Sequence, residues 1–281
     1  MFANIFFDVI SIAVVAAPIL LAIALLGGRS WKRRAMLCRD LGIPVGILFS
    51  LIGMVQMMAA EADMGMLYGA TALMLLTIFY GGVVSAMGFF FERLFADSHQ
   101  NEPVQPPTIA LLSLTIVGLL LCVAGAIFSG SPSIFIDGVA VAVWVLFLIA
   151  ALLVSSRESR ATNVARALLF ASMVSVVAGL IVFFAGDQVA GLSLAINGLI
   201  YGLMSYVTVY LICFQRGLGE PINAPLTNWH WMEVTGFYIF MFLAPDTILD
   251  NLQDAAIADR FGALEQKVED LQKELDNIER R

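Results

Sequence analysis

Long apolar runs alternate with short polar stretches along the chain, a pattern typical of a protein that crosses a membrane several times. A helix needs about 20 apolar residues to span the hydrocarbon core. The runs that meet this requirement are residues 5–27, 41–60, 66–91, 107–128, 134–155, 164–185 and 189–214. An eighth run, residues 231–246, is shorter and aromatic, and it fits a helix in the membrane interface, a re-entrant segment or a short span. The sequence therefore predicts an all-α integral membrane protein with seven or eight transmembrane helices.

Composition narrows the class of protein further. Of 281 residues, 60% are hydrophobic and only 13% are charged, whereas about a quarter of a soluble protein is charged. This excludes a soluble enzyme, a disordered protein and a nucleic-acid binder. The three cysteines share no metal-binding or redox spacing, and no ionisable residue lies in the middle of a span. We therefore expect no enzymatic activity, no catalytic residue, no metal site and no cofactor.

The basic residues predict the orientation of the chain. Lys and Arg occur between spans one and two, after span three, between spans five and six and after span seven, and the loops 61–65, 129–133 and 186–188 contain none. Because basic loops stay in the cytoplasm, the N-terminus is expected outside. In the first basic loop, Lys32, Arg33 and Arg34 are candidate contacts for anionic lipid headgroups. The alternative is that these three charges serve orientation alone.

The chain also contains signs of an internal repeat in which both copies have the same orientation. Asp8 opens the first span and Asp137 opens the fifth, 129 residues later. Tyr80-Gly81 recurs as Tyr201-Gly202 at an offset of 121. We therefore divide the chain into five parts. They are a first repeat of three spans (1–95), a polar Pro-rich linker (96–106), a second repeat of four spans (107–218), an interfacial or short-span segment (219–256) and a tail (257–281).

The tail has the apolar spacing of a coiled coil. Its seam continues from Ile257 through Phe261, Leu264, Val268, Leu271, Leu275 and Ile278, with steps of four and three residues. The seam predicts a cytoplasmic coiled coil that joins copies of the chain. A single amphipathic helix folded on the protein's own cytoplasmic face is the alternative.

Residues 41–91 carry a more specific pattern, which reads LGIPVGILFSLIGMVQMMAAEADMGMLYGATALMLLTIFYGGVVSAMGFFF. It resembles the last two spans of MotA-like stator subunits, members of the MotA/TolQ/ExbB proton-channel family. The matching residues are Gly46, Ser50, Gly53, Gln56 and Met57 in the first span, and Leu75, Leu76, Thr77, Tyr80 and Gly81 in the second. Ser50 stands where the family has Thr, and Ile78 replaces a second Thr. Residues 108–155 resemble the first two spans of the same family.

This resemblance implies a bacterial inner-membrane channel subunit that conducts ions, protons by the family pattern. Such subunits form a homo-oligomeric ring, a pentamer, around a single-span partner that carries an intramembrane Asp. Ser50 and Thr77 would line the ion pathway, and Gly46, Gly53, Tyr80 and Gly81 would pack the helices beside it. Those stators have a long cytoplasmic domain that pushes a rotor, and the corresponding loop here is about a dozen residues, so flagellar torque is not expected.

Other interpretations stay open at this point. A Ser or Thr in a membrane helix commonly bonds to its own backbone, which would remove Ser50 and Thr77 from any pathway. The whole chain could instead be a transporter built from parallel repeats for a neutral or lipid-like substrate. A third interpretation is a non-conducting membrane scaffold.

Overall fold

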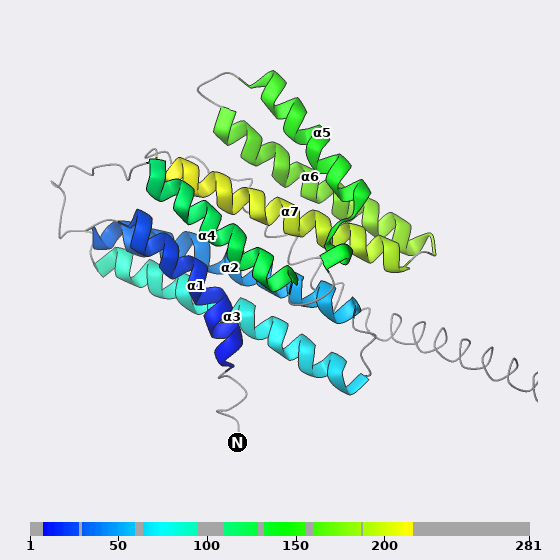
Figure 1. Cartoon of the computed structure of the whole chain (residues 1–281), viewed down its shortest axis with the longest axis horizontal. Coiled ribbons are helices and arrows are strands. Elements are labelled where there is room, and N and C mark those ends of the chain that lie inside the picture. The colour runs from blue at the N-terminus through cyan, green and yellow to red at the C-terminus, as the bar shows by residue number, and fades with distance from the viewer. Residues whose placement is uncertain are drawn as a thin grey trace, which may run out of the picture. The chain divides into compact units, whose positions relative to one another are not determined.

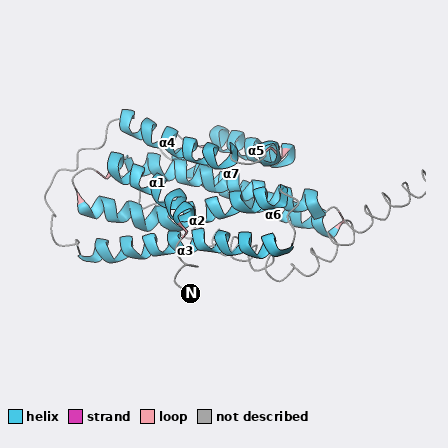
Figure 2. Ribbon diagram, turned by 60° about the horizontal axis from the view of Figure 1, so that its bottom comes forward, coloured by secondary structure: helices cyan, strands magenta, loops and turns pink. Residues whose placement is uncertain are grey.

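The computed structural model describes residues 8–27, 30–59, 64–94, 109–128, 132–155, 160–186 and 188–215. The chain divides into two compact units, Met1–Trp231 and Met232–Arg281, and every described residue belongs to the first. The elements are α1 (Val9–Leu26), α2 (Trp31–Ala59), α3 (Met64–Leu94), α4 (Ile109–Phe128), the 3₁₀ turn η2 (Pro132–Phe135), α5 (Gly138–Val154), α6 (Arg160–Phe184) and α7 (Gln188–Gln215). Across these ranges the regular structure is entirely helical (Figure 2).

Six of these helices are long and apolar enough to cross a membrane. The seventh, α5, has 17 residues, and at 1.5 Å per residue it extends about 26 Å, slightly less than the roughly 30 Å of a hydrocarbon core. The prediction of an all-helical, multi-pass membrane protein is therefore confirmed. The predicted segment 231–246 and the predicted coiled coil lie outside the described residues.

The second helix begins earlier than its hydropathy predicts. The apolar run indicates a span from residue 41, whereas α2 begins at Trp31. The sequence predicts a loop for the basic segment between the first two apolar runs, because charged side chains are excluded from the hydrocarbon core. In the structure it continues the helix beyond the hydrocarbon layer, where its charges can meet water or headgroups.

Aspartates begin two of the helices. Asp8 precedes α1 and accepts a hydrogen bond from the backbone N–H of Ser11 at 2.8 Å. Asp137 precedes α5 and accepts from the backbone N–H groups of Val139 and Ala140, each at 2.9 Å. These side chains satisfy N–H groups that have no partner inside the helix. The hydrogen bonds from Ser11 also hold the pKa of Asp8 below its usual value.

Two helix pairs dominate the packing. The consecutive helices α2 and α3 pack along their lengths, and so do α6 and α7 (Figure 1). The centre lies along α2 and α7, because α2 also contacts α1, α4 and α7, and α7 also contacts α4 and α5. In Figure 2, α2 lies between α3 on one side and α7 on the other. The most buried spans are accordingly α2 and α7.

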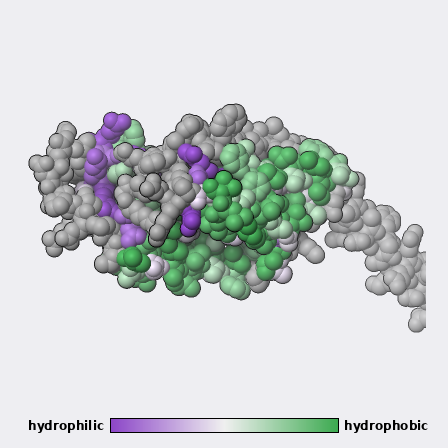
Figure 3. Space-filling view, turned by 90° about the horizontal axis from the view of Figure 1, so that it is seen from above, coloured by the Kyte–Doolittle hydropathy of each residue, from purple (hydrophilic) through white to green (hydrophobic). Residues whose placement is uncertain are grey.

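Several helices present apolar side chains to the outside. On α3 the exposed residues include Leu75, Phe79, Val83, Met87, Phe90 and Leu94. On α5 only Ala140 and Ala151 are buried. Figure 3 shows described hydrophobic residues covering a broad area of one face, with the hydrophilic ones in separate bands. Apolar surface of this extent is unfavourable in water, and it is the surface expected of helices that face lipid.

Candidate functional site

The backbones of α2 and α3 touch along a line of small residues, which we call the α2–α3 seam (Gly42, Gly46, Thr77, Gly81 and Ser85). A Cβ atom added to Gly42 would lie 2.5 Å from the carbonyl oxygen of Gly81 and 2.7 Å from the backbone nitrogen of Ser85. A Cβ on Gly46 would lie 2.8 Å from the carbonyl oxygen of Thr77. Only glycine permits such an approach, which is how small residues bring membrane helices together.

The structure brings most of the predicted site residues to this seam. Thr77 is 8% exposed and Ser50 is fully buried. Ser50 lies four residues from Gly46, on the same face of α2. Gly53 has looser packing, because its added Cβ would lie 3.5 Å from the Met74 side chain, at ordinary contact distance. The predicted residues therefore meet where the seam changes from tight to ordinary packing.

Thr77 and Tyr80 have hydrogen bonds that define their surroundings. The Thr77 hydroxyl donates to the carbonyl oxygen of Met74 on its own helix at 2.7 Å. A bond of this kind to the backbone is the alternative to a pathway role. Tyr80 contacts α1 instead of lying in the seam. Its hydroxyl oxygen accepts a hydrogen bond from the backbone N–H of Asp8 at 3.3 Å.

The α6–α7 pair has a similar construction. A Cβ on Gly179 would lie 2.5 Å from the carbonyl oxygen of Gly191. A Cβ on Gly198 would overlap the side chain of Ser175. A tyrosine again contacts the segment before a helix, because the Tyr201 hydroxyl donates to the carbonyl oxygen of Phe135, just ahead of α5.

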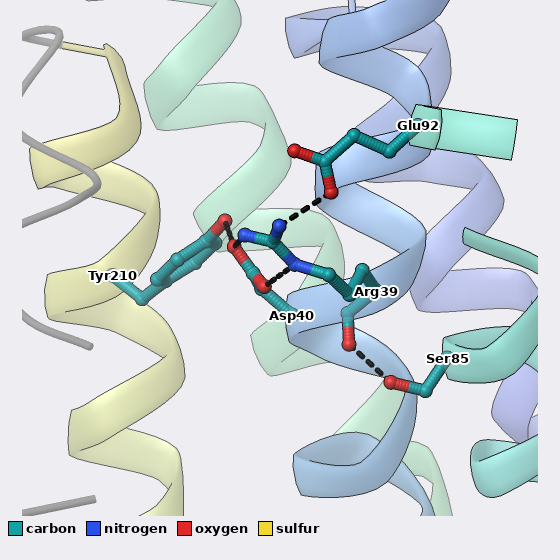
Figure 4. A network of polar contacts seen from close by, with 5 residues as sticks. All are labelled: Arg39, Asp40, Ser85, Glu92 and Tyr210. Atoms are coloured by element: carbon teal, nitrogen blue, oxygen red, sulfur yellow. Dashed lines mark hydrogen bonds and ion pairs between the residues drawn. The ribbon is translucent and has the colours of Figure 1, made fainter. Parts of the chain in front are cut away.

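A polar network lies beside the Gly42 end of the α2–α3 seam and joins α2, α3 and α7 (Figure 4). Arg39 Nε lies 2.6 Å from Asp40 Oδ1, and Arg39 Nη2 donates to Asp40 Oδ2 at 3.1 Å. Arg39 Nη1 pairs with Glu92 of α3. Tyr210 of α7 donates its hydroxyl hydrogen to Asp40 Oδ2 at 2.6 Å. The Ser85 hydroxyl donates to the carbonyl oxygen of Arg39, so the network begins at the end of the α2–α3 seam.

These charges are largely shielded. The side chains of Arg39, Asp40 and Glu92 are 29%, 9% and 19% exposed, and pairing is what makes such burial tolerable. Asp40 lies 19 residues before Ala59, the last residue of α2, which corresponds to about 28 Å along the helix. A hydrocarbon core is about 30 Å thick, so the network lies at its edge and not at its middle.

This network is not predicted from the sequence, because hydropathy favours a loop for the basic segment between the first two apolar runs and gives Asp40 and Glu92 no role. One signal was present: Tyr206, Tyr210 and Phe214 recur every four residues on α7. Their rings form a column, with centroids 6.4 Å apart for the first pair and 5.9 Å for the second.

The three candidate lipid contacts lie at the beginning of α2. Lys32 is exposed. The guanidinium carbon of Arg33 lies 4.8 Å from the centroid of the Phe214 ring, at the end of the aromatic column. The guanidinium of Arg34 lies 4.9 Å from the Trp31 ring.

Other predicted features fall outside these sites. The coiled-coil seam lies beyond the described part of the chain. Within the described ranges, no group of three His, Cys, Asp or Glu residues could hold a metal ion.

The resemblance to the MotA/TolQ/ExbB family rests on the matched residues alone. No protein-family model matches this chain, and neither does a curated protein or a solved structure.

Proposed function

We propose that the chain is a channel subunit of an ion-conducting complex in the bacterial inner membrane, similar to the MotA/TolQ/ExbB family. In this proposal, copies form a pentameric ring around a single-span partner that carries an intramembrane Asp. The observation that carries the proposal is the meeting of Gly46, Thr77 and Gly81 in the α2–α3 seam. These residues suggested the family from sequence alone, and their contact supports a shared architecture.

The packing of the seam limits where ions can pass. Around Gly42 and Gly46 the two backbones are in contact, so no pathway runs between α2 and α3 at that level. The packing is looser near Gly53, on the side away from the charged network. We therefore place the pathway beside this looser part of α2 and α3, where the partner's carboxylate would lie at the level of the buried Ser50 and Thr77.

The positions of the charges indicate which groups the partner would supply and which this chain would supply. Arg39, Asp40 and Glu92 are paired with one another at the edge of the hydrocarbon core. In a membrane protein, ionisable groups near the midplane are the usual proton carriers. The partner would supply that carboxylate, and this chain would supply hydroxyl oxygens; that of Thr77 donates its hydrogen to Met74 and keeps its lone pairs as acceptors.

The proposal is tested on the complex purified gently from its own host. Native mass spectrometry should find five copies of this chain with a substoichiometric single-span protein. In reconstituted vesicles the Thr77→Val variant should lose most of its ion flux, because Val keeps the shape of Thr and removes the hydroxyl. The matched Thr77→Ser variant should keep the flux. An assembly of two to four copies with no companion, or a Thr77→Val variant with unchanged flux, would overturn the proposal.

A transporter built from two parallel repeats is the second candidate, and specific contacts favour it. Tyr80 and Tyr201 are equivalent in the proposed repeat, and they contact the segments before α1 and α5, which are also equivalent in it. The offsets of 129 and 121 residues also relate the Gly46–Thr77 contact to the Ser175–Gly198 contact.

The hydrogen bond from Tyr210 to Asp40 joins the two proposed repeats, which is where a repeat transporter has its substrate site. Uptake of a neutral or lipid-like substrate without a companion protein would favour this candidate. An assembly that neither conducts ions nor takes up substrate would indicate the scaffold.

A further inference from the structure

We infer that the adjoining ends of α2 and α7 form a binding site for the phosphate of an acidic phospholipid, with Arg33 as its central donor. The inference goes beyond the proposed channel function and does not depend on it. The sequence offered Lys32, Arg33 and Arg34 as equal candidates. The structure distinguishes them by their surroundings.

Arg33 is the half-buried member of this group that lacks an ionic partner among the described residues. Its guanidinium stacks on the Phe214 ring at 4.8 Å, and its Nη2 is buried with no hydrogen-bond partner in the described part of the chain. A half-buried guanidinium with no ionic partner is unfavourable unless an anion balances its charge. Stacking occupies the face of the guanidinium and Nη2 is enclosed, so an oxygen ligand would approach the in-plane N–H groups of Nε and Nη1.

Nearby carboxylates do not take that place. Asp40 accepts from Arg39 and Tyr210, and Glu92 pairs with Arg39. The two acids of the network are thus already engaged by other donors. An anion for Arg33 must come from elsewhere, and phosphate suits the fork of N–H donors that arginine presents.

The depth of the site points to a lipid as the source of that phosphate. Arg33 lies seven residues beyond Asp40 on α2, which is about 10 Å further from the membrane centre. The headgroup layer adds roughly 5–8 Å on each side of the core, so the backbone of Arg33 lies just beyond it. Its guanidinium stacks on Phe214, four residues or about 6 Å past the Tyr210 that bonds to Asp40, and therefore lies at the level of the headgroups.

The surrounding residues suit a headgroup. Trp31 is 57% exposed, and tryptophan is enriched at this level of the membrane. Lys32 is exposed beside it, and the guanidinium of Arg34 stacks on the Trp31 ring. The N-terminal end of a helix also attracts negative charge, and these residues form the first turn of α2.

The test is a lipid titration of the full-length protein in mild detergent. Phosphatidylglycerol should raise the midpoint of thermal unfolding of the wild type, and phosphatidylcholine should not. The Arg33→Gln variant should need about five- to tenfold more phosphatidylglycerol for the same rise, the loss expected for one charge-assisted phosphate contact. Arg166→Gln is the matched control, because Arg166 is an exposed arginine on α6, and its titration should equal that of the wild type.

A second variant and a second anion complete the test. Phe214→Leu keeps every charge and removes the stacking ring, so it should weaken the response about two- to threefold, and it stands in for Arg33→Gln if that variant does not fold. Inorganic phosphate at the same concentrations should have no effect. Equal loss in Arg33→Gln and Arg166→Gln would reduce the site to diffuse surface charge and overturn the inference. A response to inorganic phosphate equal to the lipid response would overturn the lipid assignment.

Discussion

Asp40 is a residue through which α2 and α7 meet in a polar contact. It is on α2, and Tyr210, on α7, donates a hydrogen bond to it across a sequence separation of 170 residues. Tyr210 is fully buried, so its hydroxyl depends on this acceptor. Hydrogen bonds to charged groups contribute about 1.5–3 kcal/mol to stability.

Replacement of Tyr210 by Phe should therefore lower the free energy of unfolding by about 1.5–3 kcal/mol, because it removes one hydrogen bond to the Asp40 carboxylate and leaves the ring. The change is measured from the unfolding midpoint in detergent. Tyr206→Phe is the control, since Tyr206 belongs to the same ring column and has no hydrogen bond to Asp40. Equal losses in the two variants would contradict a specific role for the Tyr210–Asp40 bond.

At the scale of the elements, the decisive feature is how closely α2 and α3 approach. Small residues face one another on both helices, so the backbones themselves form the contact. The α6–α7 pair uses the same device with Gly179, Gly191 and Ser175. Two neighbouring glycines of α3 allow the closeness to be tested directly.

Gly81→Ala should destabilise the protein by about 1–3 kcal/mol, the usual cost of overpacking a closely packed site. Its added Cβ would overlap the carbonyl oxygen of Gly42 and lie 3.0 Å from the Cα of Gly46. Gly82→Ala adds the same methyl group one residue away, where nothing lies within 4 Å. It should be neutral or slightly stabilising, because Ala favours a helix more than Gly does. Thermal unfolding of both variants checks the pair, and equal midpoints would show that the seam is not closely packed.

For the molecule as a whole, burial follows position and not composition. The central helices α2 and α7 are buried, while α3 and α5 present large apolar side chains outward. This arrangement is the reverse of a soluble bundle, in which exposed faces are polar. It implies that lipid or other subunits cover the outer helices.

The predicted orientation can be measured on the intact protein in cells. After Cys38, Cys122 and Cys213 are replaced by Ser, a single Cys at position 133 should react with an impermeant maleimide added from outside. A single Cys at position 160 should react only after the membrane is permeabilised. Both positions are exposed in the structure, so access to the reagent depends on the side of the membrane alone. The opposite labelling pattern would reverse the predicted topology.

The sequence by itself was sufficient for the helices. A chain in a bilayer must satisfy its backbone polar groups within each helix, so long apolar runs specify helices without knowledge of their neighbours. The beginnings of two helices could also be predicted from local sequence. Asp8 and Asp137 were placed at the beginnings of spans, and both cap helices in the structure. The family pattern named Gly46 and Gly81 as packing residues, and both lie in the α2–α3 seam, where small residues let the helices pack closely.

Only the tertiary structure decided which faces are buried and which charges meet. In a membrane helix the side toward lipid is as apolar as the side toward the core, so no periodic pattern distinguishes them. Arg39, Glu92 and Tyr210 come from three helices, and nothing local to any one of them indicates the others. The network around Asp40 exists because α2 continues as a helix beyond the hydrocarbon layer and lies between α3 and α7.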